Sequence, residues 1–179
     1  MVIAHRGYSK LAKENTILAF EKAILAGAKG IECDLRLTAD EQVVIYHNKK
    51  IVVDNKKIKI SKHSISELED ICRYSGHELL VLDELFEYVK QKQAKFFLDL
   101  KSSSPTLVES ITKKIKEKNL WEQVHVTGFS FIVRNAIRAQ SQHPKLQVGQ
   151  FLHIPAYYAY IRKPKKSYCV FLGWLDSIP

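Results

Sequence analysis

Charged and imidazole side chains recur near the carboxyl ends of the strands that the sequence predicts. The residues concerned are His5, Arg6, Glu32, Asp34, His47, Asp99 and Lys101. Because alternate residues of a strand point the same way, Glu32 shares a face with Asp34, and Asp99 shares one with Lys101. Three carboxylates at one mouth of a sheet repel each other unless a cation neutralises them. Hard divalent cations prefer oxygen ligands, so we expect one Mg²⁺ or Ca²⁺ ion, or Mn²⁺, at Glu32, Asp34 and Asp99.

The other residues of this set suit chemistry on an anionic group. Two histidines, His5 and His47, can exchange protons near neutral pH, and Arg6 and Lys101 supply positive charge. A metal, an acid–base pair and a phosphate clamp together describe phosphodiester hydrolysis. Each residue alone also has a structural explanation, such as an exposed Glu-x-Asp face or a hydrogen-bonded core histidine. Their joint placement favours a site, because buried carboxylates without partners are costly.

Strands and helices are expected to alternate along the chain. Apolar runs typical of strands cover residues 1–4, 30–37, 43–47, 96–101, 124–129, 146–152 and 169–175. Helical spacing or capping signals cover residues 16–27, 64–74, 82–91, 104–118 and 130–140. This alternation predicts a parallel sheet covered by helices, either an open doubly wound sheet or a closed (β/α) barrel. Polar residues at the ends of several strands favour the barrel, whose enzymes assemble their sites at that edge.

The composition is that of one globular α/β domain, residues 1–179, with a polar, lysine-rich and irregular insertion at 48–78. The chain is 46% hydrophobic and 26% charged, and no apolar run approaches the roughly 20 residues that span a bilayer. The first strand already contains His5 and Arg6, which leaves no room for a signal peptide, so we expect a cytoplasmic protein. Three widely separated cysteines indicate reduced, packed thiols and argue against a zinc site.

The net charge of +9 has two interpretations. One is an anionic partner, such as a phosphate, a nucleic acid or an acidic membrane surface, and the other is a solvated basic surface. The excess lies in lysine clusters, and no aromatic RNA-binding motif or helix-turn-helix signal accompanies them. We therefore expect a small-molecule substrate and no specific nucleic-acid partner.

Several segments, in order and spacing, resemble the glycerophosphodiester phosphodiesterase family. They are Ala-His-Arg-Gly at 4–7, Glu-Asn-Thr at 14–16, Gly-Ile-Glu-Cys-Asp at 30–34 and Val-Val-Ile-Tyr-His at 43–47. Leu-Asp-Glu at 82–84, Asp-Leu-Lys at 99–101 and Thr-Gly-Phe at 127–129 are similar to later motifs of that family. The resemblance runs from residue 2 to about residue 152. It implies a (β/α)₈ TIM-type barrel with a small insertion after the second histidine, where residues 48–78 lie.

The resemblance also implies a role for each residue at the strand ends. It assigns the metal to Glu32, Asp34 and Asp99, and acid–base catalysis to His5 and His47. Arg6 and Lys101 would contact the phosphate, and Glu14 and Asn15 would shape the loop around it. In that family the substrate's own glycerol hydroxyl is thought to attack phosphorus, and water then opens the cyclic phosphate. The expected products are glycerol 3-phosphate and an alcohol such as choline or ethanolamine.

Three positions depart from the family's pattern. Asn48 stands where the family usually has aspartate, which removes a charge beside His47. Lys13 replaces a proline before Glu14. Asp99 is shorter than the usual glutamate, so the metal must lie closer to that strand or bind through water. Aspartate at this position also occurs in the related sphingomyelinase D group, which makes lysophospholipid-type substrates an alternative.

The length is the largest departure. A barrel of this kind typically needs about 250 residues, whereas this chain has 179. The apolar runs match the first five strands, with the run from Cys169 as a sixth, so we expect an incomplete barrel that lacks the last two strand–helix units. Exposed strand edges favour aggregation, so we expect a second copy, or the aromatic stretch Tyr157, Tyr158 and Tyr160, to cover the gap. The alternative function is that of a degenerate, non-catalytic relative that binds phosphorylated ligands or a protein partner.

Overall fold

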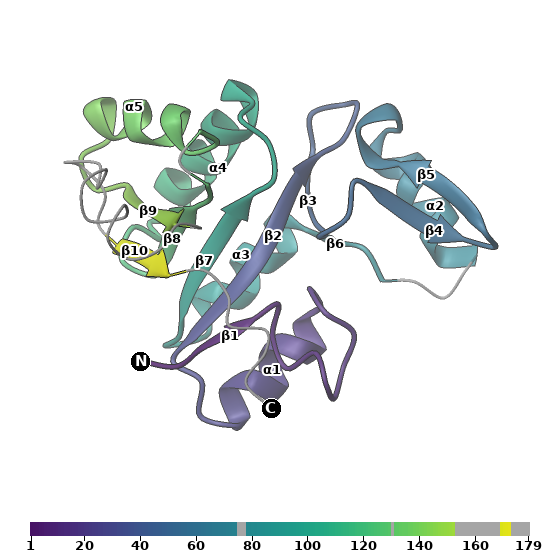
Figure 1. The fold of residues 1–179 in the computed structure, drawn as a ribbon, viewed down its shortest axis with the longest axis horizontal. Helices are drawn as coiled ribbons and strands as arrows, with labels where there is room; N and C mark the ends of the chain where they lie inside the picture. Colours follow the sequence, from purple (N-terminus) through teal and green to yellow (C-terminus); the bar gives the residue numbers. More distant parts are fainter. Residues whose placement is uncertain (75–77, 130, 153–168, 173–179) are drawn as a thin grey trace.

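A parallel sheet in chain order forms the frame of the protein (Figure 1). The structure is a computed structural model, and it describes residues 1–74, 78–129, 131–152 and 169–172. Six of the described strands pair in parallel, in the order β1 (Ile3–His5), β2 (Gly30–Leu37), β7 (Lys95–Leu100), β8 (Val124–Thr127), β9 (Gln147–Leu152) and β10 (Cys169–Leu172). Spatial order therefore follows chain order, as in a (β/α) barrel, whereas a doubly wound sheet reverses its order at a switch point. In the described residues β1 does not pair with β10, so this part of the barrel is open.

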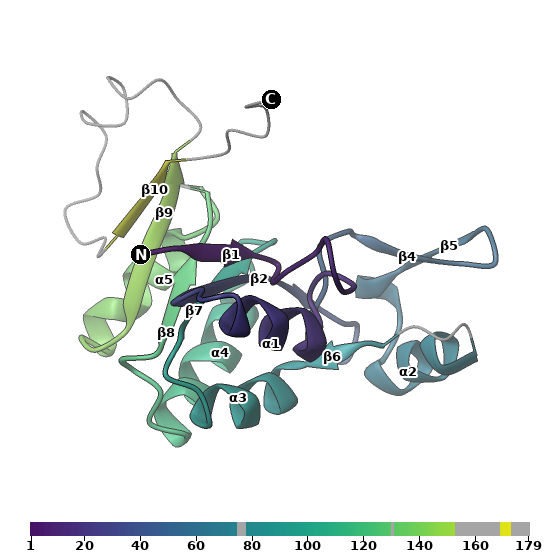
Figure 2. The ribbon, with the colours of Figure 1, turned by 90° about the horizontal axis from the view of Figure 1, so that it is seen from below.

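Four helices connect these strands and cover one face of the sheet (Figure 2). They are α1 (Ile17–Leu25), α3 (Leu82–Lys90), α4 (Pro105–Glu117) and α5 (Arg134–Gln142). The prediction for α5 was wrong at its start, because residues 131–133 form a turn and the first helical residue is Arg134. The bounds of the other three helices lie within two residues of those expected. Among the described residues, no helix is both long and apolar enough to cross a membrane.

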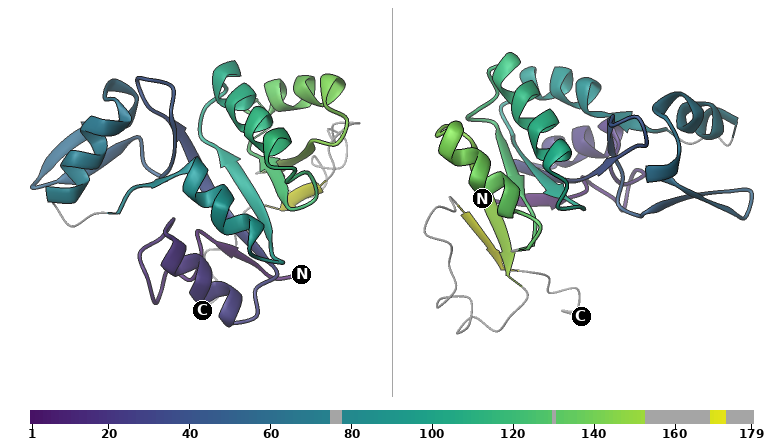
Figure 3. Two further views of the ribbon diagram at one scale, coloured as in Figure 1. Left: turned by 180° about the vertical axis from the view of Figure 1, so that it is seen from behind. Right: turned by 90° about the horizontal axis from the view of Figure 1, so that it is seen from above.

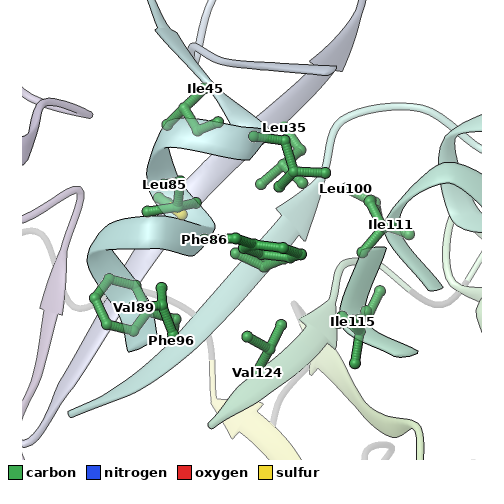
Figure 4. Packing of buried hydrophobic residues seen from close by; sticks show 14 of the residues in the cluster. Leu35, Ile45, Leu85, Phe86, Val89, Phe96, Leu100, Ile111, Ile115 and Val124 are labelled. Atoms are coloured by element: carbon green, nitrogen blue, oxygen red, sulfur yellow. The ribbon is translucent and has the colours of Figure 1, made fainter. Parts of the chain in front are cut away.

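The main hydrophobic core lies between the sheet and these helices (Figure 4). Helix α3 inserts Leu82, Leu85, Phe86 and Val89, the i, i+3, i+4 and i+7 positions of one helical stripe. Strand β2 faces them with the alternate residues Ile31, Cys33 and Leu35, all fully buried. The intervening residues of β2, including Glu32 and Asp34, point to the other side of the sheet and are buried as well. The apolar side of β2 therefore anchors the strand, and its acidic side faces the barrel interior.

The segment between β2 and α3 first extends the sheet with β3 (Val43–Ile45) and β6 (Leu80–Val81), and the part between these two strands forms a lobe beside the sheet (Figures 1 and 3). Strand β3 pairs antiparallel with the carboxyl end of β2, and β6 pairs antiparallel with β3. Between them lie the hairpin of β4 (Lys50–Val53) and β5 (Lys56–Lys59), the short helix η1 (Ile60–Lys62) and helix α2 (Ile65–Tyr74). A second small core holds this lobe together.

The lobe partly contradicts the expectation of an irregular insertion. Helix α2 begins as predicted, since Ser64 N–H donates to the Glu67 carboxylate at 2.7 Å and Glu67 N–H donates back to the Ser64 hydroxyl at 3.4 Å. The hairpin at 50–59 was missed, because its lysines mask the apolar alternation. Its turn residues Asp54 and Asn55 have φ of 47° and 61°, the left-handed conformation that two-residue hairpin turns require.

The cysteines agree with the expectation of reduced, packed thiols where the structure describes them. Cys33 and Cys72 are both free and buried. The side chain of Cys169, the aromatic stretch Tyr157, Tyr158 and Tyr160, and the end of the apolar run at 173–175 lie outside the described residues.

Candidate active site at the carboxyl edge of the sheet

Strand register brings the predicted site residues together. His5 is the register partner of Glu32, and Asp34 is the register partner of Asp99. Because the strands are parallel, their carboxyl ends meet at one edge. Glu32, Asp34 and Asp99 are only 5%, 0% and 3% exposed, and one oxygen of each lies within 4.8 Å of the other two. Sequence positions far apart therefore form one buried acidic cluster.

Two cationic groups and one amide surround Asp34 at the centre of this cluster. Lys101 Nζ lies 2.7 Å from Asp34 Oδ1, and Arg6 Nε lies 3.0 Å from Asp34 Oδ2. Asn15 Nδ2 donates to Asp34 Oδ2 at 2.7 Å, while the Asp34 N–H donates to Asn15 Oδ1 at 3.2 Å. Burial alone would raise the pKa of Asp34, but Lys101, Asn15 and Arg6 outweigh it and hold that pKa below its usual value. Asp34 is therefore the anionic centre of the site.

The other two carboxylates hold their charge less readily. Burial and repulsion from Asp34 and Asp99 raise the pKa of Glu32 well above its usual value. Burial, with repulsion from Asp34, also raises the pKa of Asp99 to about 6, although the ion pair between Asp99 and Lys101 opposes this shift. The cluster is thus short of positive charge, even with Lys101 and Arg6 beside it.

The acidic cluster fits a hard divalent cation. Its donors are all carboxylate oxygens, which such cations prefer, and Asp99 Oδ1 is buried without a hydrogen-bond partner in the described part of the chain. The shorter side chain of Asp99 still reaches the same 4.8 Å set as Glu32 and Asp34. The donor set therefore suits Mg²⁺, Ca²⁺ or Mn²⁺, but it does not distinguish between them.

The loop after β1 positions Arg6 and Asn15 through unusual backbone angles. Arg6, Gly7 and Asn15 have φ of 55°, 81° and 60°, all in the left-handed region. A Cβ on Gly7 would lie only 2.7 Å from the backbone carbon of Ala19, so only glycine fits between this loop and α1. The Asn15 N–H donates to the Arg6 carbonyl at 3.1 Å, which closes the loop.

Glu14 and Thr16 stabilise the two ends of the same turn. Glu14 Oε2 accepts from Arg6 Nη1 at 3.0 Å and so orients the guanidinium from the side opposite Asp34. Thr16 caps α1 by accepting the Ala19 N–H at 3.2 Å, and its hydroxyl donates to the Lys13 carbonyl at 2.7 Å. Glu14 therefore contacts Arg6 from this loop, and Asn15 contacts Asp34.

The two histidines of the predicted acid–base pair have different neighbours, Glu32 for His5 and Asn48 for His47. His5 Nε2 is 3.6 Å from Glu32 Oε2, and burial, together with the positive charge of Arg6, lowers the pKa of His5 to about 4. His47 Nδ1 is 3.1 Å from the Asn48 side-chain oxygen, and partial burial lowers its pKa too. Because an amide oxygen only accepts, it makes Nδ1 the protonated nitrogen of neutral His47 and leaves Nε2 as the acceptor. Asn48 therefore orients the ring without adding a charge.

The other histidines that the structure describes contact residues outside this cluster. His125 stacks on Phe97 with ring centroids 4.8 Å apart, and burial lowers its pKa to about 4. His143 stacks on Trp121, and His63 Nδ1 lies 3.0 Å from the Lys59 carbonyl oxygen. His77 and His153 lie outside the described residues.

Two residues of the site were missed by sequence reasoning. Arg36 Nε donates to the His47 carbonyl at 2.9 Å, and its Nη2 donates to the same oxygen, so β2 holds the chain next to His47. Thr127 is the register partner of Asp99, and its hydroxyl is buried without a hydrogen-bond partner in the described part of the chain. Arg36 could have been found from the sequence, because it lies two residues after Asp34 and so shares its face of the strand. Thr127 could not, because only the register of β8 against β7 shows that it lies beside Asp99.

Comparison with known proteins agrees with the geometry. A model of the glycerophosphoryl diester phosphodiesterase family matches residues 5–169. A curated glycerophosphodiester phosphodiesterase from Caldanaerobacter subterraneus subsp. tengcongensis is 31% identical over 157 residues, which cover 82% of this chain. The chain spans 65% of the length of that relative, just under two thirds.

Solved structures share the fold of the chain. A glycerophosphodiester phosphodiesterase from Thermotoga maritima superposes with a TM-score of 0.74 at 24% identity, over 94% of this chain and 71% of that one. A phosphodiesterase from Oleispira antarctica, solved in complex with the product sn-glycerol 3-phosphate, superposes with a TM-score of 0.73 at 24% identity, over 90% of this chain and 70% of that one. Since the family model covers nearly the whole chain, and these folds agree with its incomplete barrel, the chain belongs to the glycerophosphoryl diester phosphodiesterase family.

Proposed function

We propose that this protein hydrolyses glycerophosphodiesters to glycerol 3-phosphate and an alcohol, with the help of one divalent metal ion. The observation that carries the proposal is the convergence of three buried carboxylates, within 4.8 Å of one another, with His5 and two cationic groups at the carboxyl edge of the barrel. Membership of the phosphodiesterase family supports it. The product in the Oleispira antarctica structure, sn-glycerol 3-phosphate, is the product that we propose for this chain.

Glu32, Asp34 and Asp99 would hold the metal ion. When bound, a divalent cation neutralises the carboxylates and stabilises negative charge on the phosphoryl oxygens. A bound cation would compete with Lys101 and Arg6 for these carboxylate oxygens. The N–H groups of these two cationic side chains are then available to the phosphate of the substrate, which would orient it against the histidines.

The two histidines would carry the protons. Both have lowered pKa values, so both imidazoles are neutral near pH 7 and able to accept a proton. One would deprotonate the glycerol hydroxyl that attacks phosphorus, and the other would protonate the leaving alcohol oxygen. The donor must first be protonated, and the negative phosphate beside it raises the pKa of that imidazole. Water would then open the cyclic phosphate, with the histidines exchanging their roles.

The test is release of glycerol 3-phosphate from glycerophosphocholine, glycerophosphoethanolamine and glycerophosphoglycerol, with Mg²⁺, Ca²⁺ or Mn²⁺ and with EDTA. We expect metal-dependent turnover, abolished in His5→Ala and His47→Ala and retained in His143→Ala, whose ring stacks on Trp121 away from the site. No turnover with any metal, in protein shown to be folded, would refute the proposal and favour a degenerate relative that binds phosphorylated ligands or a protein. Turnover of lysophospholipids alone would favour a sphingomyelinase D-like activity.

Oligomeric state and cellular location stay predictions. Strands β1 and β10 are the free edges of the described parallel sheet, and a second copy of the chain would cover them. Solution scattering that gives the mass of a single chain would contradict the oligomer, and fractionation of cells would test the cytoplasmic location.

A further inference from the structure

A basic pocket lies beside the acidic cluster, on the side of the inserted lobe. Its volume is about 410 Å³, and it lies between the carboxyl ends of β2 and β7 and the start of η1. The polar residues of its lining that matter here are Arg36, Lys49, Lys59, Ser61, Lys101 and Ser102. The size is within the range of pockets that bind small organic ligands, about 300–1,000 Å³.

Among the described residues, three of the cations of this pocket lack a direct ion-pair partner, although the nearby Asp34 and Asp99 act on Arg36 from a greater distance. Of the residues that the structure describes, four cationic side chains and no carboxylate line the pocket. Lys101 pairs with Asp34 and Asp99, but Arg36, Lys49 and Lys59 have no carboxylate within ion-pair distance among the residues that the structure describes. Arg36 is half-buried, and in the described part of the chain its guanidinium donates to one acceptor, the backbone carbonyl of His47. Three unpaired cations around one hollow create a positive potential that favours an anion.

Two residues link the pocket to the proposed active site. Lys101 lines the pocket and also pairs with the carboxylates of the cluster. Arg36 lines the pocket and binds the carbonyl of His47. A substrate whose phosphate lies against Lys101 therefore has one arm at the carboxylates, where the attacking glycerol hydroxyl is needed, and room for its other arm in the basic pocket.

We propose that this pocket binds a second phosphoryl group on the alcohol arm of the substrate. The preferred substrates are then glycerophosphodiesters whose alcohol carries its own phosphate or phosphodiester. This inference rests on the proposed function and adds the substrate class. Lysine and arginine N–H groups and the hydroxyls of Ser61 and Ser102 are suitable donors to phosphate oxygens. The quaternary ammonium of choline would instead meet like charges, which makes glycerophosphocholine a poor substrate.

The experiment compares bis(glycerophospho)glycerol, which has a second phosphodiester, with glycerophosphoglycerol and glycerophosphocholine. Lys49→Ala/Lys59→Ala removes two pocket charges. Lys56→Ala/Lys57→Ala removes two charges from the same hairpin but outside the pocket lining, and serves as the matched control. Each ion pair between one of these exposed lysines and the second phosphate should raise kcat/KM roughly two- to fivefold. The pocket variant, which loses both pairs, should therefore lose about tenfold in kcat/KM on bis(glycerophospho)glycerol.

The loss should appear in KM and not in kcat, should shrink at high salt, and should be absent in the control variant and on glycerophosphoglycerol. Wild-type protein that shows no preference for the second phosphodiester, or equal losses in the two variants, would overturn the inference.

Binding of inorganic pyrophosphate by calorimetry separates this inference from the proposed function. If no substrate is turned over, the proposed function fails. The pocket would still be supported by pyrophosphate affinity that falls in Lys49→Ala/Lys59→Ala and is unchanged in Lys56→Ala/Lys57→Ala. Equal affinity in all three proteins would overturn it.

Discussion

Asn15 combines two contributions to stability that substitution can separate. It exchanges hydrogen bonds of 2.7 and 3.2 Å with the side chain and backbone of Asp34, and its own backbone has φ of 60°. Asn15→Gly removes both bonds but keeps a residue that tolerates positive φ. Asn15→Ala removes the same bonds and, unlike glycine, keeps a Cβ in the left-handed conformation, without the polar side chain that lets asparagine adopt it. The difference between the two variants is therefore the backbone contribution.

The magnitudes follow from burial and charge. A hydrogen bond to a charged group contributes about 1.5–3 kcal/mol, and a buried N–H left without an acceptor costs about 1–3 kcal/mol. Because Asn15 is only 5% exposed, we expect Asn15→Gly to lower the free energy of unfolding by about 3–5 kcal/mol. Asn15→Ala should lose roughly 1–2 kcal/mol more. Domains are stable by about 5–15 kcal/mol, so the Gly variant stays measurable while the Ala variant approaches the unfolding threshold of a marginal domain.

Equilibrium unfolding in urea measures both variants, and Asn119 is the matched control. Asn119 follows α4, has φ of 54° and is exposed, so it has the same backbone conformation without the bonds to Asp34. Asn119→Gly should be nearly neutral, and Asn119→Ala should lose roughly 1–2 kcal/mol. If Asn15→Gly loses no more than Asn119→Gly, the bonds to Asp34 contribute nothing, and the interpretation that Asn15 holds Asp34 in place is wrong.

Three further outcomes test other parts of the site. Divalent cations should raise Tm more at pH 7 than at pH 5, since a carboxyl with the pKa of about 6 found for Asp99 is about nine-tenths ionised at pH 7 and about one-tenth at pH 5. A metal-induced rise in Tm that is larger at pH 5 than at pH 7 would contradict this expectation. Without metal, the raised pKa of Asp99 means that its contribution to stability is present below about pH 4 and is lost as the pH rises through 6. Gly7→Ala should prevent folding or cost several kcal/mol, because its Cβ would lie 2.7 Å from the Ala19 backbone, and a near-native urea midpoint would refute this close approach. Thr127→Val should raise the free energy of unfolding by about 1 kcal/mol, because it removes a buried hydroxyl that has no partner among the described residues, whereas a loss would indicate that the hydroxyl is bonded.

Much of the fold was predictable because it depends on residues close together in sequence. The two-residue period of β2 and the helical stripe of α3 are local patterns, and both elements form as expected. The Ser64–Glu67 capping box also lies within one turn, and it marks the start of α2 correctly. The hairpin at 50–59 is the local exception, since its register depends on a turn at Asp54 and Asn55 that lacks the usual glycine.

The sequence by itself predicted that Glu32, Asp34 and Asp99 share one edge of the sheet and that they suit a divalent cation, because strand period and motif spacing are local. The prediction of parallel strands was wrong for β3, the strand before His47, which runs antiparallel to β2. Only the tertiary structure decided how the side chains of the site pair. It placed Lys101 and Arg6 on Asp34, Asn15 against the same carboxylate, and Arg36 on the chain at His47. It also formed the basic pocket, by bringing lysines of the inserted lobe to the ends of β2 and β7. These contacts join residues that are distant in the chain, so their distances and charges depend on register and packing, which local sequence patterns do not determine.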